Sequence, residues 1–261
     1  MAVVRAFFEI IRIDSALLGF LSVFIPCLSR TSDLSFSASQ ALPILFICMS
    51  TFVANDLDDV ERDAINHPQR PLPSRQLPAW AATVVYFACV LAALYAIKHL
   101  IGGKHAFWYF VLVVVSVSYG YVVDAAPALK TTYVAVCASA PLAMVAVLFP
   151  TDHSIRIVAA STFLATVGRE SCMDIRDRPG DGESWMHRFD AGRVAVAGFG
   201  IQGLAVAIMA LAARRRIQWL VWIGMLATLS FAYQLWFGAD KKRASIALMK
   251  VEFALGLAFL V

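Results

Sequence analysis

The stretch Asn55-Asp56-Leu57-Asp58-Asp59-Val60-Glu61-Arg62-Asp63 follows directly on an apolar run at 41–54. A helix continued through it would place Asp56, Asp59 and Asp63 on one face, at i, i+3 and i+7. Like charges on one face repel each other, so this arrangement needs bound cations. Carboxylates are typical ligands of Mg²⁺, which commonly shares its coordination shell with substrate phosphates. The stretch therefore predicts a site for Mg²⁺ and phosphate at the end of an apolar helix.

The rest of the chain has the composition of a membrane protein. Of its 261 residues 60% are hydrophobic and 15% are charged, and the mean hydropathy is +0.72. These values exclude an ordinary soluble domain. The net charge of +4 comes with no basic run interleaved with aromatic residues, so we expect no nucleic-acid partner. We predict an all-α bundle in the lipid bilayer, forming one domain over 1–261.

Apolar runs bounded by charged residues, glycine or proline predict nine transmembrane helices. Each run is about long enough to cross a hydrocarbon core of ~30 Å as a helix. The predicted ranges are 15–29, 39–55, 79–97, 105–123, 131–149, 155–170, 193–213, 217–237 and 244–261.

The distribution of Lys and Arg predicts the orientation. With nine spans, about twice as many of these residues fall on the side that holds the N-terminus and both acidic loops. Cytoplasmic loops carry the excess of positive charge, so we place that side in the cytoplasm. The segment 1–14 carries Arg5, Glu9 and Arg12 among apolar residues, and we expect a short amphipathic surface helix there.

A second acidic stretch repeats the spacing of the first. Asp174, Asp177 and Asp181 again stand at i, i+3 and i+7, although Pro179 limits the helix, so that Asp181 is expected to lie on a turn. A solvated surface would account for one such cluster, but two of identical spacing on one predicted side favour a shared site. Facing each other, they would hold two or three Mg²⁺ ions that bridge a diphosphate and stabilise it as a leaving group. The cationic side chains available for its phosphate oxygens are Arg62, Arg70, Lys130, Arg176 and Arg178.

The two motifs carry a family resemblance. Asn55-Asp56-x-x-Asp59-x-x-x-Asp63, followed by Asn66-x-Pro68-x-Arg70-Pro71, resembles the first motif of the UbiA superfamily of intramembrane prenyltransferases. Asp174-x-x-Asp177-x-x-x-Asp181 looks like the second. The resemblance implies nine transmembrane helices, Mg²⁺ as cofactor and a prenyl diphosphate as donor. By position it implies these metal ligands: Asn55, Asp56, Asp59, Asp63, Asp174, Asp177 and Asp181.

The resemblance also implies roles for other side chains. Tyr119 or Tyr121, ahead of Leu129-Lys130, resembles the tyrosine that precedes a Leu-Lys pair in the family, and we select Tyr121. The implied catalytic residues are then Asp56, Asp59, Asp174, Asp177, Tyr121 and Lys130, with diphosphate binding by Arg62, Arg70, Lys130 and Arg176.

Three functions fit these observations. The leading one is Mg²⁺-dependent transfer of a prenyl group to a lipophilic acceptor, aromatic or otherwise electron-rich. The segment 182–188 departs from the family pattern, which leaves open a membrane terpene cyclase that needs no acceptor. A transporter or channel is the third, but its acidic residues would be expected near the bilayer midplane. Here the acidic residues lie at helix ends, which favours an enzyme at the membrane surface.

Overall fold

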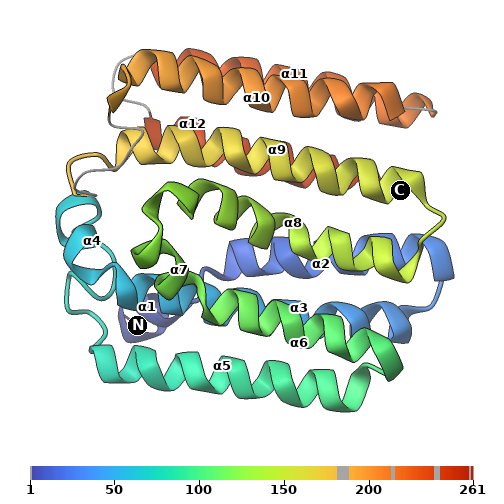
Figure 1. Ribbon diagram of the computed structural model, residues 1–261, viewed down its shortest axis with the longest axis horizontal. Coiled ribbons are helices and arrows are strands. Elements are labelled where there is room, and N and C mark those ends of the chain that lie inside the picture. Colours follow the sequence, from blue (N-terminus) through green and yellow to red (C-terminus); the bar gives the residue numbers. More distant parts are fainter. Residues whose placement is uncertain (1, 181–187, 213–214, 238–241, 259, 261) are drawn as a thin grey trace. The chain divides into compact units, whose positions relative to one another are not determined.

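Helices make up the computed structural model of the chain (Figure 1), which describes residues 2–180, 188–212, 215–237, 242–258 and 260. The described residues form α-helices and one short 3-10 helix, and they contain no strand. The prediction of an all-α fold is confirmed. Contacts divide the chain into two compact units, residues 1–130 with 179–182 and residues 131–178 with 183–261.

The first unit is organised around one long helix. This helix, α3, packs against α2, α5 and α6, which run beside it in Figure 1. It begins where the Asp33 side chain accepts a hydrogen bond of 2.9 Å from the Phe36 N–H, which caps the helix. The elements of this unit are α1 (Ala2–Ile10), α2 (Ile13–Thr31), α3 (Leu34–Asp58), α4 (Val60–Asn66), α5 (Ala79–Leu100), α6 (Gly103–Val117), α7 (Tyr119–Ala125) and η1 (Pro127–Leu129).

The second unit contains a close helix pair, α9 and α10. A Cβ added to Gly198 on α10 would lie 2.7 Å from the Gly168 carbonyl oxygen and 3.0 Å from the Cys172 sulfur on α9. Small residues allow backbones to approach this closely in membrane bundles. The helices of this unit are α8 (Lys130–Leu148), whose first residue belongs to the first unit, α9 (His153–Arg176), α10 (Ala191–Ala212), α11 (Arg216–Phe237) and α12 (Lys242–Ala258).

Six helices are long and apolar enough to cross a membrane. They are α2, α3, α5, α8, α10 and the part of α11 from Gln218 to Phe237, counted over the described residues. The prediction of a multi-pass integral membrane protein is thereby supported. Three further helices overlap the remaining predicted ranges without meeting the same criteria: α6 and α12 are shorter, and α9 is less apolar.

The predicted helix at 105–123 is wrong in one respect, because the structure divides it. The first helix, α6, ends at Val117, and α7 begins at Tyr119 after Ser118. Gly120 on α7 lies against the carboxylate of Asp58 on α3, where an added Cβ would clash. The break therefore accompanies a close approach of α7 to the end of α3.

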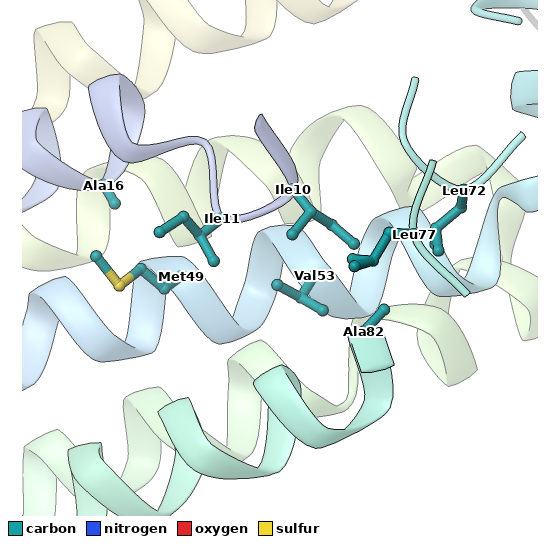
Figure 2. Close-up of a cluster of buried hydrophobic side chains, with 8 residues drawn as sticks. All are labelled: Ile10, Ile11, Ala16, Met49, Val53, Leu72, Leu77 and Ala82. Atoms are coloured by element: carbon teal, nitrogen blue, oxygen red, sulfur yellow. The ribbon is translucent and has the colours of Figure 1, made fainter. Parts of the chain in front are cut away.

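A cluster of buried apolar side chains holds together the end of the first unit that carries the acidic stretch. Figure 2 shows Ile10 of α1, Val53 of α3 and Ala82 of α5 together with Leu72 and Leu77, which come from the turns after α4. All five are buried. Because Arg12, Asp56 and Arg70 each lie within three residues of a member of this cluster, the packing fixes where their backbones run.

Candidate functional site

The first acidic stretch begins on α3 and ends on α4. The prediction of one continuous helical face is wrong, because the helix is interrupted at Asp59, with φ −97° and ψ 12°. Hydrogen bonding continues across the break, since the Asp59 N–H donates to the Asn55 carbonyl at 3.0 Å. Asp56 and Asp63 are only 4% and 5% exposed, while Asp59 is half-buried. Two of the three carboxylates are thus buried, and the third, at the interruption, is partly accessible.

Arginines neutralise the two buried carboxylates. Arg70 Nη1 lies 2.5 Å from Asp63 Oδ2 and 3.5 Å from Asp56 Oδ1. Arg12 Nη2 also pairs with Asp56 Oδ1. A buried carboxylate without a partner would be strongly destabilising, so these pairs make the burial possible. Arg70, predicted from sequence to bind phosphate, is therefore at the centre of this cluster.

Turns after α4 set the position of Arg70. The Arg70 N–H donates to the His67 carbonyl at 2.9 Å, and the Arg70 carbonyl accepts the Ser74 N–H at 3.0 Å. Two residues further on, Leu72 enters the buried cluster of Figure 2. The proline-rich stretch is thus an ordered, packed segment that presents Arg70 to the carboxylates.

A more exposed set of contacts surrounds Asp59. Arg62 Nη1 lies 2.9 Å from Asp59 Oδ1, and the Asn55 side-chain amide donates to Asp59 Oδ2 at 3.1 Å. Arg62, predicted to bind diphosphate, is exposed and close to the acidic stretch. The exposure of this pair leaves it a weak contributor to stability, and both groups are accessible to a ligand.

The second acidic stretch closes α9. Asp174 is 6% exposed, and the buried hydroxyl of Thr131 donates to its Oδ2 at 3.1 Å. Asp177 is half-buried at the helix end and pairs with Arg176, whose Nε and Nη2 lie 2.6 and 2.5 Å from its carboxylate oxygens. The third predicted residue of this motif, Asp181, lies outside the described residues.

Gly180, the last described residue after Pro179, packs on α4 of the first unit. The Gly180 N–H donates to the side-chain oxygen of Asn66 at 3.0 Å. A Cβ added to Gly180 would lie 2.6 Å from Asn66 Nδ2 and 2.8 Å from the Arg62 carbonyl oxygen. Only glycine fits this contact without displacing its neighbours.

Asp56 also opens onto a cleft, which we call the α1 cleft. Its volume is about 1060 Å³. Its lining comes from α1, from Arg12 in the link between α1 and α2, from Asp56 on α3 and from the turns after α4. The lining residues are Val4, Arg5, Phe8, Glu9, Arg12, Asp56, Gln69, Arg70, Pro71 and Gln76.

The sequence profile of the UbiA prenyltransferase family matches residues 18–257, which is most of the chain. The chain belongs to the UbiA prenyltransferase family. A digeranylgeranylglyceryl phosphate synthase of Methanoculleus marisnigri is 30% identical to this UbiA-family chain over 181 residues, 68% of this chain and 64% of that protein. Another of Methanococcus maripaludis is 26% identical over 98 residues, 35% of this chain and 34% of that protein. The matches thus span less than two thirds of either relative.

Solved structures of UbiA homologues share the fold. An apo homologue from Aeropyrum pernix K1 superposes with a TM-score of 0.68 at 14% identity, covering 95% of this chain and 94% of that one. A homologue from Archaeoglobus fulgidus bound to GPP and Mg²⁺ gives a TM-score of 0.65 at 15% identity, with 98% of each chain covered. At these identities the likeness establishes the architecture.

The donor set of this UbiA-family chain fits Mg²⁺ by its chemistry. Carboxylate and amide oxygens are the ligands that this hard cation takes. Within the described residues no three Asp, Glu, His or Cys side chains are gathered as a preformed metal site. Arginines occupy the carboxylates of Asp56, Asp63 and Asp177 instead. The predicted set of seven ligands remains a prediction.

Two predicted catalytic residues lie on other elements. Tyr121 is on α7 and is 83% exposed, while Lys130 is half-buried at the start of α8. The structure also shows site residues that sequence reasoning did not assign: Arg12, Thr131 and Gly180. From the sequence, Arg12 is predicted only to belong to a surface helix. It lies 44 residues from Asp56 in the sequence, and no local pattern connects the two.

Proposed function

We propose that this UbiA-family protein ionises a prenyl diphosphate in the presence of Mg²⁺ and transfers the prenyl group to a lipophilic acceptor within the membrane. The observation that carries the proposal is the contact of Arg70 with the buried carboxylates of Asp56 and Asp63, where the apolar helix α3 gives way to α4. Carboxylates bind Mg²⁺ and guanidinium groups bind phosphate oxygens, so a site that holds both suits a diphosphate bound together with Mg²⁺. The place of the cluster, at the end of an apolar helix, suits a donor with a charged head and an apolar tail.

Mg²⁺ is the cofactor in this proposal. Homologues from Archaeoglobus fulgidus have been solved with Mg²⁺ together with GPP and together with DMAPP, which supports the assignment. When bound, Mg²⁺ neutralises the diphosphate and stabilises it as a leaving group. The residues proposed to hold it are Asn55, Asp56, Asp59, Asp63, Asp174, Asp177 and Asp181.

The side chains of the protein then have separate tasks. Guanidinium and ammonium groups hold the phosphate oxygens as the carbon–oxygen bond to the prenyl chain breaks, with the bonding electrons leaving on the diphosphate. The apolar helices exclude water, which would otherwise capture the allylic cation. Tyr121 keeps its proposed catalytic role. The groups proposed for the diphosphate are Arg62, Arg70, Lys130 and Arg176.

The acceptor is the less determined part of the proposal. The sequence expectation was an aromatic or electron-rich acceptor. The relatives are named digeranylgeranylglyceryl phosphate synthases, which favours an acceptor of the glyceryl phosphate class. We therefore propose a lipophilic acceptor and test both chemical classes.

The proposed topology adds further membrane-spanning helices to the six described above. We propose that α6, α9 and α12 also cross the bilayer, which gives nine spans and places the N-terminus and both acidic stretches in the cytoplasm. Labelling of single cysteines introduced at Gln69 and at Arg188, from either side of sealed membranes, tests this. Labelling of either position by a reagent that reaches only the side opposite the cytoplasm contradicts the topology.

Product analysis of the purified protein tests the function. The protein is incubated with Mg²⁺ and prenyl diphosphates of increasing chain length, with an aromatic acceptor, with a prenylated glyceryl phosphate or with neither. Diphosphate release that yields a prenylated acceptor supports transfer and identifies the acceptor class. A cyclic hydrocarbon formed without any acceptor would instead establish a terpene cyclase.

A further inference from the structure

We propose that the α1 cleft is a phosphate-binding site, in which Arg12 leaves Asp56 and binds a phosphate group when Mg²⁺ occupies the acidic stretch. This inference rests on the proposed function and adds to it a binding residue and a binding surface. Arg12 belongs to neither acidic motif, and the cleft joins it to Asp56 of the first motif.

The backbone at Arg12 is held in an unfavourable conformation. Its φ of 44° and ψ of 57° are left-handed, which costs a residue with a Cβ on the order of 1 kcal/mol. The strained residue joins α1 to α2 and directs its side chain at Asp56. Strain of this kind persists only where the surrounding structure fixes it, and here Ile10 and Ile11 are both buried immediately before Arg12.

The guanidinium of Arg12 contacts two groups, and only one of them is a proposed metal ligand. One is the ring of Phe52, whose centroid lies 5.3 Å from Arg12 Cζ. The other is the carboxylate of Asp56. The aromatic contact does not depend on the metal, whereas Asp56 is a proposed metal ligand. A carboxylate oxygen that binds Mg²⁺ gives up much of its attraction for a guanidinium group, so Mg²⁺ releases Arg12 and leaves it stacked beside the cleft.

The charges of the cleft then become those of an anion site. Its lining holds Arg5, Arg12 and Arg70 against Glu9 and Asp56. Arg5 is already paired with Glu9 on the same helix. Arg70 also pairs with Asp63, which is itself a proposed metal ligand. Once Asp56 and Asp63 are bound to Mg²⁺, the guanidinium groups of Arg12 and Arg70 are less neutralised by these carboxylates. Their planar donors match two phosphate oxygens at once.

The apolar part of the lining suits an amphiphilic ligand. Val4 and Phe8 come from the exposed side of α1, and Pro71 comes from the turns after α4. A phosphate bound by Arg12 would therefore have apolar groups beside it for an attached chain. The phosphate can belong to the donor diphosphate or to the head group of a glyceryl phosphate acceptor, and the experiment separates these two sources.

The experiment measures binding by the purified full-length protein in detergent. Calorimetry gives the affinity for Mg²⁺ alone, and then for inorganic pyrophosphate and for glycerol phosphate at saturating Mg²⁺. The variants are Arg12→Gln, which removes the charge, and Arg12→Lys, which keeps the charge without the planar donors. Arg30→Gln is the matched control, because it makes the same charge change in the last turn of α2.

The proposal predicts opposite effects on the two kinds of ligand. Arg12→Gln binds Mg²⁺ at least as tightly as the wild type, because a competing cation is gone. It binds one of the two phosphate ligands about tenfold more weakly, as expected for a lost charge-assisted hydrogen bond. That ligand is pyrophosphate if the site serves the donor, and glycerol phosphate if it serves the acceptor. Arg12→Lys lies between the two, and Arg30→Gln binds all three ligands like the wild type.

Other results overturn it. If Arg12→Gln weakens Mg²⁺ and phosphate binding equally, Arg12 is a structural clamp on Asp56. If Arg12→Gln and Arg12→Lys both leave the two phosphate ligands unchanged, the cleft is no phosphate site, and the proposed function stands without it. A wild type that binds neither Mg²⁺ nor pyrophosphate contradicts the proposed function itself. Thermal melting of each variant shows whether it is folded, and Arg12→Lys serves if Arg12→Gln is not.

Discussion

The backbone N–H of Gly180 donates a hydrogen bond of 3.0 Å to the side-chain oxygen of Asn66. Gly180 lies within the second acidic motif, one residue before Asp181, and Asn66 ends α4, the helix that carries Asp63 of the first. The two residues are 114 positions apart along the chain. The contact holds Gly180 against α4. It means that a change in either position acts on the place where the first acidic stretch ends.

Gly180→Ala is predicted to lower catalytic efficiency with the prenyl diphosphate about tenfold or more. An added Cβ would lie 2.6 Å from Asn66 Nδ2 and 2.8 Å from the Arg62 carbonyl, so the backbone at position 180 must move away from α4. Steady-state kinetics of diphosphate release measures the effect. Gly200→Ala is the control, because no atom lies within 4 Å of a Cβ added there. Equal activity of the two variants would show that the Gly180 contact is dispensable.

Thr131→Val is predicted to weaken Mg²⁺ binding at the second acidic stretch about tenfold. The hydroxyl of Thr131 donates to Asp174 at 3.1 Å in a buried environment, so its removal leaves a buried carboxylate oxygen without this partner. Thr131→Ser keeps the hydroxyl and is expected to restore binding. Thr132→Val is the matched control on the same helix, because Thr132 is exposed.

Calorimetric titration with Mg²⁺ checks this prediction. Thr131 would have no role in positioning Asp174 if Thr131→Val and Thr132→Val gave the same affinity as the wild type. A loss of affinity in Thr131→Ser as large as that in Thr131→Val would point to packing instead of the hydrogen bond.

Leu77→Ala is predicted to destabilise the fold by about 2–4 kcal/mol, because it opens a cavity in the cluster of Figure 2. The same change moves the turns that carry Arg70, so donor binding also weakens. Thermal melting and pyrophosphate titration measure the two effects. Leu91→Ala on α5 is the control, since that side chain is 65% exposed and makes few contacts to lose. A melting temperature equal to that of Leu91→Ala would contradict the assignment of Leu77 to this core.

Periodicity and composition predicted the parts of the molecule that depend on local sequence. Apolar runs located the membrane helices, and the repeated acidic spacing located Asp56, Asp63 and Asp174, all of which are buried. Arg70 was selected because it is a cation close to the first motif in sequence, and it contacts two of that motif's carboxylates.

The remaining features depend on contacts between distant parts of the chain. Arg12 reaches Asp56 only because α1 and α3 pack through Ile10 and Val53, and no spacing in the sequence records this. The hydrogen bond between Thr131 and Asp174 is of the same kind.

The breaks in helices were missed for a related reason. Neither Asp59 nor Ser118 is adjacent to a proline or glycine that would predict a break at that residue. Gly120 lies two residues after Ser118. At Ser118 the structure supplies a tertiary cause, because α7 approaches Asp58 closely at Gly120. A contact between segments far apart in the sequence leaves no periodic pattern, so periodicity does not predict this break.

The central claim is that the two acidic stretches together activate a prenyl diphosphate. The most direct measurement is the rate of diphosphate release by purified Asp59→Ala and Asp177→Ala variants, with Mg²⁺ and a prenyl diphosphate, compared with the wild type. Loss of metal ligation at either stretch is predicted to slow release by about a hundredfold or more, since the leaving group loses its charge stabilisation. Release at the wild-type rate in both variants would contradict the account.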